Sequence, residues 1–393
     1  MEYMKIKSIR DFKDLKGKKV LLRTDFNVPI KNGKILDEYK IMKQLPTIHF
    51  LLRNKCKIIM FTHFGSPVPG TYAKEFSTKV ICNKLSKILD RKIIFAEKYD
   101  FLAIGSKISK MKEGEILMLE NVRFNEGEEK NDKKFAKHLA GLADVYVNDA
   151  FAVSHRAHAS VSAIKAYIPS YAGLLLENEV KHLDKAMNPK KPLIFVIGGV
   201  KLTTKIPLIK NFEKKAYRIL VGGALANNFL AAHGLEVGKS IVDEKSIKFA
   251  KKFKNKNILL PIDVVVSSDK GSKKATVKNI NEVGKNDYIF DIGPKTIALY
   301  ASFIRRAETI IWNGPMGFFE LKSFKYGTRS IARLIAARSG GKAFGVVGGG
   351  ETVEALKETK MLNYVDWVST GGGAMLSFLG GEKMPGLAGL IKK

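Results

Sequence analysis

Short apolar runs alternate with amphipathic stretches along the whole chain, and this alternation constrains the fold more than any other feature. In the first half the runs are Lys19–Arg23, Lys57–Thr62, Ile93–Ala96, Ile116–Leu119 and Val145–Asn148. In the second half they are Leu193–Ile197, Ile219–Val221, Ile258–Leu260, Thr309–Trp312, Phe344–Val347 and Trp367–Ser369. Helical patterns lie between them, including Ser77–Leu89, Lys134–Leu142, Leu225–Ala232 and Ser330–Ala337. Strands that alternate with helices form βαβ units, so we predict an α/β fold of parallel sheets with helices on both faces.

The length and one internal stop signal predict two domains. A chain of 393 residues exceeds the size at which a single hydrophobic core keeps growing. The charged helical pattern Glu177–Met187 ends in Asn188-Pro189-Lys190-Lys191-Pro192, which is a helix-stop and turn signal. We predict an N-terminal domain over 1–173, a hinge helix over 174–191 and a C-terminal domain over 192–374.

The cysteines and the N-terminal residues favour a cytoplasmic protein. Cys56 and Cys82, the two cysteines, fall in a predicted strand and a predicted helix and have no disulfide or metal spacing. No apolar run reaches the length of a membrane span, and residues 1–6 lack the apolar segment of a secretory signal.

The formal net charge of +30 leaves two interpretations open. Lysine and arginine could neutralise the phosphates of a nucleic acid. The lysines are scattered through the sequence, however, and no nucleic-acid-binding module is evident. We favour a lysine-rich surface suited to small anionic substrates.

Cationic side chains follow successive predicted strands of the first half. Arg23 ends the first strand and is followed by Asp25 and Asn27; His63, Arg123 and Arg156 follow later strands. The carboxyl ends of parallel strands meet at one edge of a sheet, so these groups are expected at a common cleft. Arginine binds carboxylate or phosphate, while aspartate and asparagine hydrogen-bond to hydroxyl groups. The pattern predicts an anion site.

Glycine-bearing turns follow the predicted strands of the second half. They are Gly198-Gly199 with Lys201 and Lys205 beyond, Gly222-Gly223, Gly293, Asn313-Gly314, and Gly348-Gly349-Gly350 before Glu351-Thr352. Glycine lacks the Cβ that would keep backbone N–H groups from a polyphosphate, and a helix N-terminus favours negative charge. No Walker A pattern occurs, so a P-loop protein is not indicated.

These motifs, in this order, resemble those of the phosphoglycerate kinases, in the bacterial style, along essentially the whole chain. They are Asp25–Pro29, Glu120–Phe124, Asn148–Phe151 with His155–His158, Trp312–Pro315 and Ser369–Ala374. The resemblance implies two Rossmann-like domains, with residues 375–393 packing back on the N-terminal domain, and a monomer. It also implies reversible phosphoryl transfer from 1,3-bisphosphoglycerate to Mg-ADP in glycolysis, giving 3-phosphoglycerate and ATP.

The resemblance implies roles for individual residues. The phosphoglycerate site would comprise Arg23, Asp25, Phe26, Asn27, Lys40, His63, Phe64, Gly65, Ser66, Arg123 and Arg156. The nucleotide site would comprise Gly198, Gly199, Lys201, Lys205, Gly222, Gly223, Gly293, Asn313, Glu320, Gly349, Gly350, Glu351 and Thr352. Gly222, Gly223 and Gly293 would line the adenine slot, Glu320 would contact the ribose, and Glu351 would contact Mg²⁺.

The chemistry needs no general base, because the reacting carboxylate is already ionised at neutral pH. Catalysis would consist of positioning and charge neutralisation by Lys40, Lys201, Mg²⁺ and backbone N–H groups near Gly349 and Gly372. The substrates would lie on different domains, so a hinge motion is expected to bring them together.

Three positions depart from the family pattern. Lys40 stands where the family has an arginine, and lysine keeps the charge but loses the planar fork. Ser66 replaces the arginine of His-Leu-Gly-Arg-Pro, and Glu351 replaces an aspartate. One lost charge-assisted hydrogen bond costs about 1.5–3 kcal/mol, or roughly ten- to a hundredfold in rate or binding. We therefore expect an active, slower kinase.

Two alternatives remain. A catalytically weakened member could use its basic surface to hold nucleic acid, which would require a continuous basic stripe rather than a basic cleft. A kinase for another carboxylate, such as acetate or carbamate, is less consistent with Asp25, Asn27, Arg123 and Arg156 together.

Overall fold

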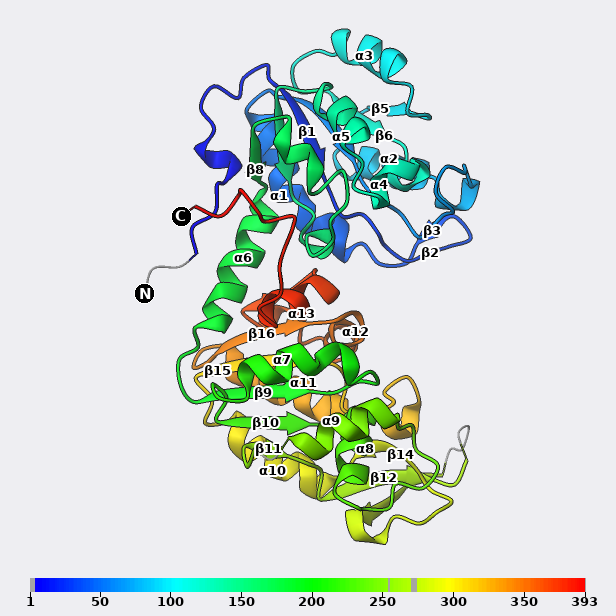
Figure 1. The fold of residues 1–393 in the computed structure, drawn as a ribbon, viewed down its shortest axis with the longest axis vertical. Coiled ribbons are helices and arrows are strands. Elements are labelled where there is room, and N and C mark those ends of the chain that lie inside the picture. The colour runs from blue at the N-terminus through cyan, green and yellow to red at the C-terminus, as the bar shows by residue number, and fades with distance from the viewer. Residues whose placement is uncertain (1–3, 254, 270–273, 393) are drawn as a thin grey trace. The chain divides into compact units, whose positions relative to one another are not determined.

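The computed structural model describes residues 4–253, 255–269 and 274–392, which divide into two compact units (Figure 1). The first unit extends to Lys181 and takes in the segment from Lys383 onward; the second is His182–Glu382. The division falls within helix α6 (Leu174–Met187), which the sequence analysis assigned to the linking helix.

The first unit is built on a parallel sheet. Among the described residues its strand order is β5-β6-β4-β1-β7-β8. The bounds are β1 Lys19–Arg23, β4 Lys57–Phe61, β5 Ile93–Ala96, β6 Ile116–Leu119, β7 Val145–Asn148 and β8 Ser170–Ala172. The chain direction across the sheet reverses between β1 and β7, and ligands of open α/β sheets bind beyond the carboxyl ends of the strands at such a point.

Helices cover both faces of this sheet, as predicted. Along β1, Val20 and Leu22 face one hydrophobic cluster, whereas Leu21 faces another. The first cluster includes residues of α1 (Tyr39–Arg53) and α2 (Lys79–Ile88). The second includes residues of α3 (Phe101–Ser109) and α5 (Lys133–Ala140). Strands buried on both faces carry continuous apolar runs, which is why the sequence marked them so clearly.

The second unit has its own parallel sheet, with the order β11-β10-β9-β15-β16-β17 over the part of the chain that is described. Numbered within the unit, this is the doubly wound order 3-2-1-4-5-6. The bounds are β9 Leu193–Ile197, β10 Arg218–Val221, β11 Ile258–Leu259, β15 Thr309–Asn313, β16 Phe344–Gly348 and β17 Trp367–Val368. Its helices are α7 Ile206–Phe212, α8 Gly223–Ala232, α9 Glu244–Lys252, α10 Pro294–Ile304, α11 Tyr326–Ser339, α12 Gly350–Glu358 and α13 Gly373–Leu379.

Both units therefore have the predicted Rossmann-like architecture, with additions that the sequence analysis did not anticipate. The second unit carries an antiparallel sheet of β13 (Thr276–Asn279), β12 (Asp263–Ser267) and β14 (Tyr288–Ile292). The first unit carries the hairpin of β2 (Ile30–Lys31) and β3 (Lys34–Ile35), and the short helix α4 (Glu126–Glu129).

The C-terminal segment packs within the first unit. Lys7 N donates to Leu390 O at 2.7 Å, and Asn148 Nδ2 donates to Gly386 O at 3.3 Å. Helix α13, which lies before Lys383, belongs to the second unit.

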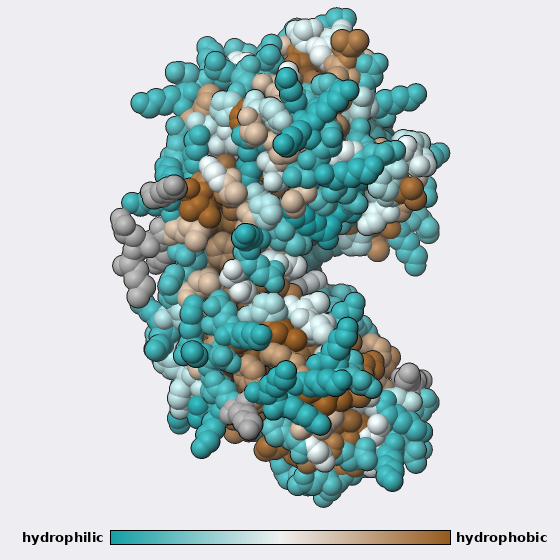
Figure 2. Space-filling model, in the orientation of Figure 1, coloured by the Kyte–Doolittle hydropathy of each residue, from teal (hydrophilic) through white to brown (hydrophobic). Residues whose placement is uncertain are grey.

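On the face shown in Figure 2, hydrophilic residues cover most of the first unit, whereas hydrophobic residues are interspersed with hydrophilic ones on the second. No helix in the described ranges is long and apolar enough to cross a membrane.

Candidate active site

Arg23 lies at the point in the first sheet where the chain direction reverses. It ends β1 and is in register with Asn148, the last residue of β7. Its side chain is fully buried; Nε donates to Ser160 Oγ at 3.0 Å, and Nη2 lies 3.4 Å from His63 Nδ1. A buried guanidinium needs a compensating negative charge.

Glu128 supplies that charge. Its Oε1 lies 4.0 Å from Arg23 Nη2, and its carboxylate accepts hydrogen bonds from the backbone N and the hydroxyl of Ser160 at 2.9 and 2.6 Å. Burial raises the pKa of Glu128, although Arg23 acts in the opposite direction. The sequence analysis missed Glu128, because its neighbours Glu126 and Glu129 offer the same residue type on the surface.

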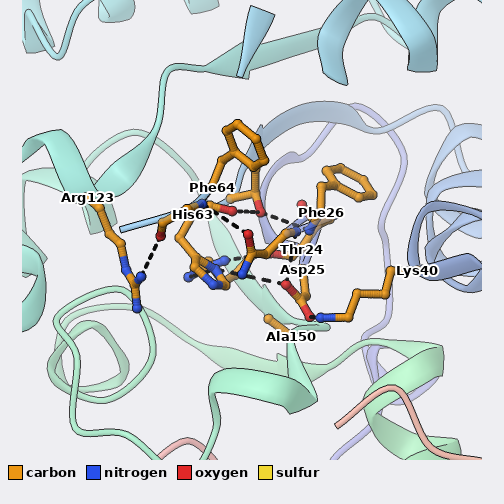
Figure 3. Close-up of polar contacts among 12 residues, drawn as sticks. Thr24, Asp25, Phe26, Lys40, His63, Phe64, Arg123 and Ala150 are labelled. Carbon is orange, nitrogen blue, oxygen red and sulfur yellow. Dashed lines mark hydrogen bonds and ion pairs between the residues drawn. The ribbon is translucent and has the colours of Figure 1, made fainter. Parts of the chain in front are cut away.

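Asp25 and Lys40 form the ion pair at the centre of this edge (Figure 3). Lys40 Nζ, near the start of α1, lies 2.8 Å from Asp25 Oδ2, and the Asn27 backbone N donates to Oδ1 at 3.2 Å. Burial alone would raise the pKa of Asp25, but the charge of Lys40 and these hydrogen bonds lower it below its ordinary value. The Asp25 carboxylate is therefore ionised, and Lys40 remains 30% exposed toward solvent.

The loop after β4 is held to the same edge. Gly65 N donates to Asn27 Oδ1 at 3.0 Å, and Arg123 Nη1 donates to Gly65 O at 2.6 Å and to Ser66 Oγ at 3.2 Å. Phe64 is fixed by Asn121, whose side chain bonds both its N and its O. The sequence analysis did not assign Asn121 a role. The structure shows that its side chain connects the loop after β6 to the loop after β4.

His63 and the arginines of this edge differ in charge and exposure. Burial, with help from nearby arginines, lowers the pKa of His63 well below its ordinary value despite the carboxylate of Asp25, so the imidazole is neutral at pH 7. Arg123 is mostly buried and its Nε lies 3.0 Å from Glu129 Oε1. Arg156 is exposed, and its Nε lies 3.4 Å from His155 Nε2. Phe26 is buried beneath this edge, with its N donating to Thr62 Oγ1.

In the second unit the glycine turns pack directly on one another. Gly198 N donates to Asn313 O, and Gly199 N donates to Pro315 O at 2.8 Å. A Cβ on Gly198 would stand 2.1 Å from Pro315 O, and Gly199 has φ +85°. Only glycine allows the loops after β9 and β15 to approach so closely.

Two lysines follow the first of these turns. Lys205 is 7% exposed and donates to the carbonyl of Gly198; burial lowers its pKa to about 8, although Glu351 acts in the opposite direction. Lys201 is exposed. The cationic side chains predicted for the nucleotide thus occupy two environments, one buried against the glycine turn and one in solvent.

The turn after β16 leads into helix α12. Gly349 is its N-cap at φ +102°, and a Cβ there would stand 2.9 Å from Asn313 Nδ2 and 3.2 Å from Thr352 Oγ1. Thr352 Oγ1 accepts from Gly314 N at 2.8 Å, and Asn313 Nδ2 donates to Gly348 O at 2.8 Å. The turns after β15 and β16 therefore pack together at the N-terminus of α12. Backbone N–H groups at a helix N-terminus favour binding of an anion.

The three glycines predicted to line the adenine slot have different surroundings. Gly223 lines a small pocket with Ala226, Leu230, Phe290 and Met316. Gly222 and Gly293 do not line it: a Cβ on Gly222 would meet Met316 Sδ at 2.6 Å, and one on Gly293 would meet Asp263 Cγ at 2.3 Å. They are glycines because neighbouring chain packs against them.

Glu320, Glu351 and Gly350 are not enclosed by the protein. Glu320 and Glu351 are exposed, with Glu351 in the first turn of α12, and nothing lies within 4 Å of a Cβ built on Gly350. Gly372 has φ +47° before α13. Within the described residues no cluster of three histidine, cysteine or acidic side chains could hold a metal ion. A single accessible carboxylate fits Mg²⁺ that is bound mainly through a nucleotide's phosphates.

Known proteins resemble this chain in sequence and in fold. A family model described as phosphoglycerate kinase matches residues 9–382. The phosphoglycerate kinases of Thermosipho africanus and Dictyoglomus turgidum are 42% and 43% identical over 395 and 396 residues, covering 98% and 99% of each chain. The solved phosphoglycerate kinases of Coxiella burnetii and Pyrococcus horikoshii OT3 superpose with TM-scores of 0.87 and 0.84, at 40% and 31% identity, covering 98% of both chains.

The comparisons show that the protein is a phosphotransferase whose acceptor is a carboxyl group, and its basic sheet edge and its glycine turns agree with that class. The chain belongs to the phosphoglycerate kinase family. It catalyses reversible phosphoryl transfer between 1,3-bisphosphoglycerate and ADP in glycolysis. The comparisons do not support the alternative of a nucleic-acid-binding protein.

Proposed function

We propose that the first unit binds phosphoglycerate at the edge formed by Asp25, Asn27, Lys40, Arg123 and Arg156. The observation that carries this proposal is that Lys40 and Arg123 are fixed at this edge by ion pairs and hydrogen bonds, with exposed Arg156 as a further cation. Arg156 and Arg123 supply the charge for the phosphate, whereas Asp25 and Asn27 offer oxygen acceptors to the glycerate hydroxyl. Arg23, Phe26, His63, Phe64, Gly65 and Ser66 form the wall that holds these groups in place.

For the second unit we propose that the nucleotide's phosphates bind Lys201, Lys205 and the backbone at Gly198–Gly199 and Gly349–Thr352. The close packing of these turns supports this, because it leaves backbone rather than side chains at the helix N-terminus. Asn313 braces the turn through Gly348. The resemblance implies that Glu320 would contact the ribose and that the base would lie beside Gly223, where the pocket of about 10 Å³ would have to widen to admit it.

Transfer to a carboxylate requires no proton removal, so the protein's task is positioning and charge neutralisation. Lys40 would stabilise the transferring phosphoryl group from the first unit; Lys201 and the N–H groups near Gly349 and Gly372 would do so from the second. Glu351 is the residue that would hold Mg²⁺, which, when bound, neutralises phosphate charge.

The substrates bind to different units, so turnover requires a hinge motion that brings the substrates into reach. We also propose that the protein acts as a cytoplasmic monomer, as the family resemblance implies.

Separate binding of the two substrates tests the assignment. We expect Arg156→Ala to weaken binding of 3-phosphoglycerate about tenfold or more and to leave ATP binding unchanged in calorimetry. Lys201→Ala should do the reverse. If either variant weakened both substrates equally, or neither, the assignment of sites to units would be wrong.

A further inference from the structure

A second basic pocket lies in the first unit, away from the proposed substrate edge. It is an open depression of about 740 Å³ between α3, α5 and the starts of two strands, and Lys134, Lys137 and His138 in its lining are exposed. Its lining includes Lys19, Lys57, Phe101, Lys134, Lys137 and His138. Pockets of a few hundred to a thousand Å³ are the usual size for binding small molecules.

The pocket is at the opposite edge of the sheet from Arg23. Lys19 and Lys57 are the first residues of β1 and β4, whereas Arg23 is the last residue of β1 and His63 follows the carboxyl end of β4. Four residue steps along a strand span about 13 Å. A ligand in this pocket would therefore not contact the side chains assigned to phosphoglycerate.

The lysines of this pocket lie in pairs whose positive charges repel each other. Lys19 and Lys57 are direct register partners on neighbouring strands, and like charges in that position are destabilising. Lys134 and Lys137 are three residues apart on α5, on one helix face. Within the described residues, Lys19 pairs with Asp144 at 3.6 Å, and Lys57, Lys134 and Lys137 have no carboxylate partner.

The same pocket has an aromatic and apolar floor. The half-buried ring of Phe101 lies 5.1 Å from the ring of His138, and the buried side chains of Ile108 and Leu142 continue the lining. A ligand that contacted only the lysines would leave this aromatic and apolar surface exposed to solvent. One with both a phosphate chain and a flat ring would contact both parts.

We propose that this pocket binds an organic polyphosphate with an aromatic ring, of which ATP is a representative. The unpaired ammonium groups of Lys57, Lys134 and Lys137 would hold the phosphates, and the ring would stack on Phe101 with its edge toward the tilted ring of His138. The site lies in the first unit and is distinct from the nucleotide site of the second. The lysines of this site contribute to the net charge of +30 and are not among the residues proposed for phosphoryl transfer.

Equilibrium dialysis with radiolabelled ATP at fixed salt tests this proposal. The unmodified chain is expected to bind two ATP molecules, and the double variant Lys134→Ala/Lys137→Ala one, because losing two charge-assisted contacts weakens binding about a hundredfold. The control Lys107→Ala/Lys110→Ala removes the same charge from exposed positions around the end of α3 that do not line the pocket. It should retain two.

Phosphoryl-transfer activity should be the same in all three proteins, which shows that each is folded. Tripolyphosphate, which lacks the ring, should displace the second ATP less well than unlabelled ATP does. The proposal is overturned if the unmodified chain binds one ATP, or if the Lys134→Ala/Lys137→Ala variant still binds two. Equal displacement by tripolyphosphate would contradict the role of Phe101.

Discussion

The two proposed anion sites are built by different means on similar sheets. In the first unit, side chains are proposed to bind the anion: Lys40 and Arg123 are held in place by carboxylates and carbonyls of the loops around them. In the second, the backbone dominates: Gly199 and Gly349 adopt positive φ so that turns can pack at a helix N-terminus. The first unit should therefore be sensitive to a lost charge, and the second to an added Cβ.

The largest effect is expected from Lys40→Met in the first unit. This variant removes the cation proposed for the transferring phosphoryl group and leaves the buried Asp25 carboxylate without its partner. Together these losses should cost about 3 kcal/mol, or roughly a hundredfold in kcat/KM for 3-phosphoglycerate. Steady-state kinetics check this, with Lys40→Arg as the charge-retaining control. A Lys40→Met enzyme with unchanged kcat/KM would contradict the role of Lys40.

The same ion pair has a consequence for acid stability. The folded pKa of Asp25 is lowered, so the pair contributes stability above the unfolded pKa, and this contribution is lost as pH falls through the lower folded value. Lys40→Met should therefore be less stable than the unmodified chain at about pH 6, and the difference should shrink as pH falls, because the variant has no such contribution to lose. Urea unfolding between pH 3 and about 6 measures the difference.

In the second unit, Gly349→Ala should impair use of the nucleotide. The φ of +102° is strained for alanine, and the new Cβ would press on Asn313 and Thr352. We expect a loss of about 2 kcal/mol, or roughly thirtyfold in kcat/KM for ATP, with the KM for 3-phosphoglycerate unchanged. Gly341→Ala is the control, because nothing lies within 4 Å of its added Cβ. Equal effects of the two variants would refute the close-packing argument.

A smaller effect is expected from Glu128→Gln, which removes the charge opposite buried Arg23 while keeping the side-chain size. The free energy of unfolding should fall by about 2 kcal/mol, and the KM for 3-phosphoglycerate should rise several-fold. Glu126→Gln should change stability by less than about 0.5 kcal/mol, because Glu126 pairs with Lys130 in solvent. Urea unfolding and kinetics distinguish them; similar losses in both variants would show that burial of Glu128 is irrelevant.

The smallest effect concerns the pH dependence of nucleotide binding. Burial lowers the pKa of Lys205 to about 8, so its ammonium loses the proton as pH rises through that value and phosphate binding should weaken. Calorimetry from pH 7 to about 9.5 should show ATP affinity falling several-fold more in the unmodified chain than in Lys205→Met. Parallel profiles would exclude Lys205 as the titrating group.

The sequence predicted the buried parallel strands well, because strands covered on both faces carry continuous apolar runs. It missed β8, which has only three residues, and β13, whose Thr276–Asn279 is largely exposed and lacks an apolar pattern. The apolar strands β12 and β14 were overlooked although they carry an apolar pattern, and the two-residue strands of the hairpin are too short to show one.

The sequence also predicted only part of the candidate site. Arg23, Asp25 and Asn27 could be predicted because strand ends place them at one edge. The dependence of Arg23 on Glu128 could not, since it joins positions about a hundred residues apart through a buried contact. The packing role of Gly222 and Gly293 was equally hidden, because a glycine in a sequence does not reveal which neighbour fills its space.

The most direct test of the account is a coupled assay with 3-phosphoglycerate and Mg-ATP. It compares the unmodified chain with Lys40→Arg and Ser66→Arg. Because Lys40 already reaches Asp25 at 2.8 Å and Ser66 already accepts from Arg123, we predict substantial turnover in the unmodified chain. The arginine variants should change it by less than about tenfold. Turnover that appears only when arginine is restored would contradict the claim that this lysine-based site is catalytically complete.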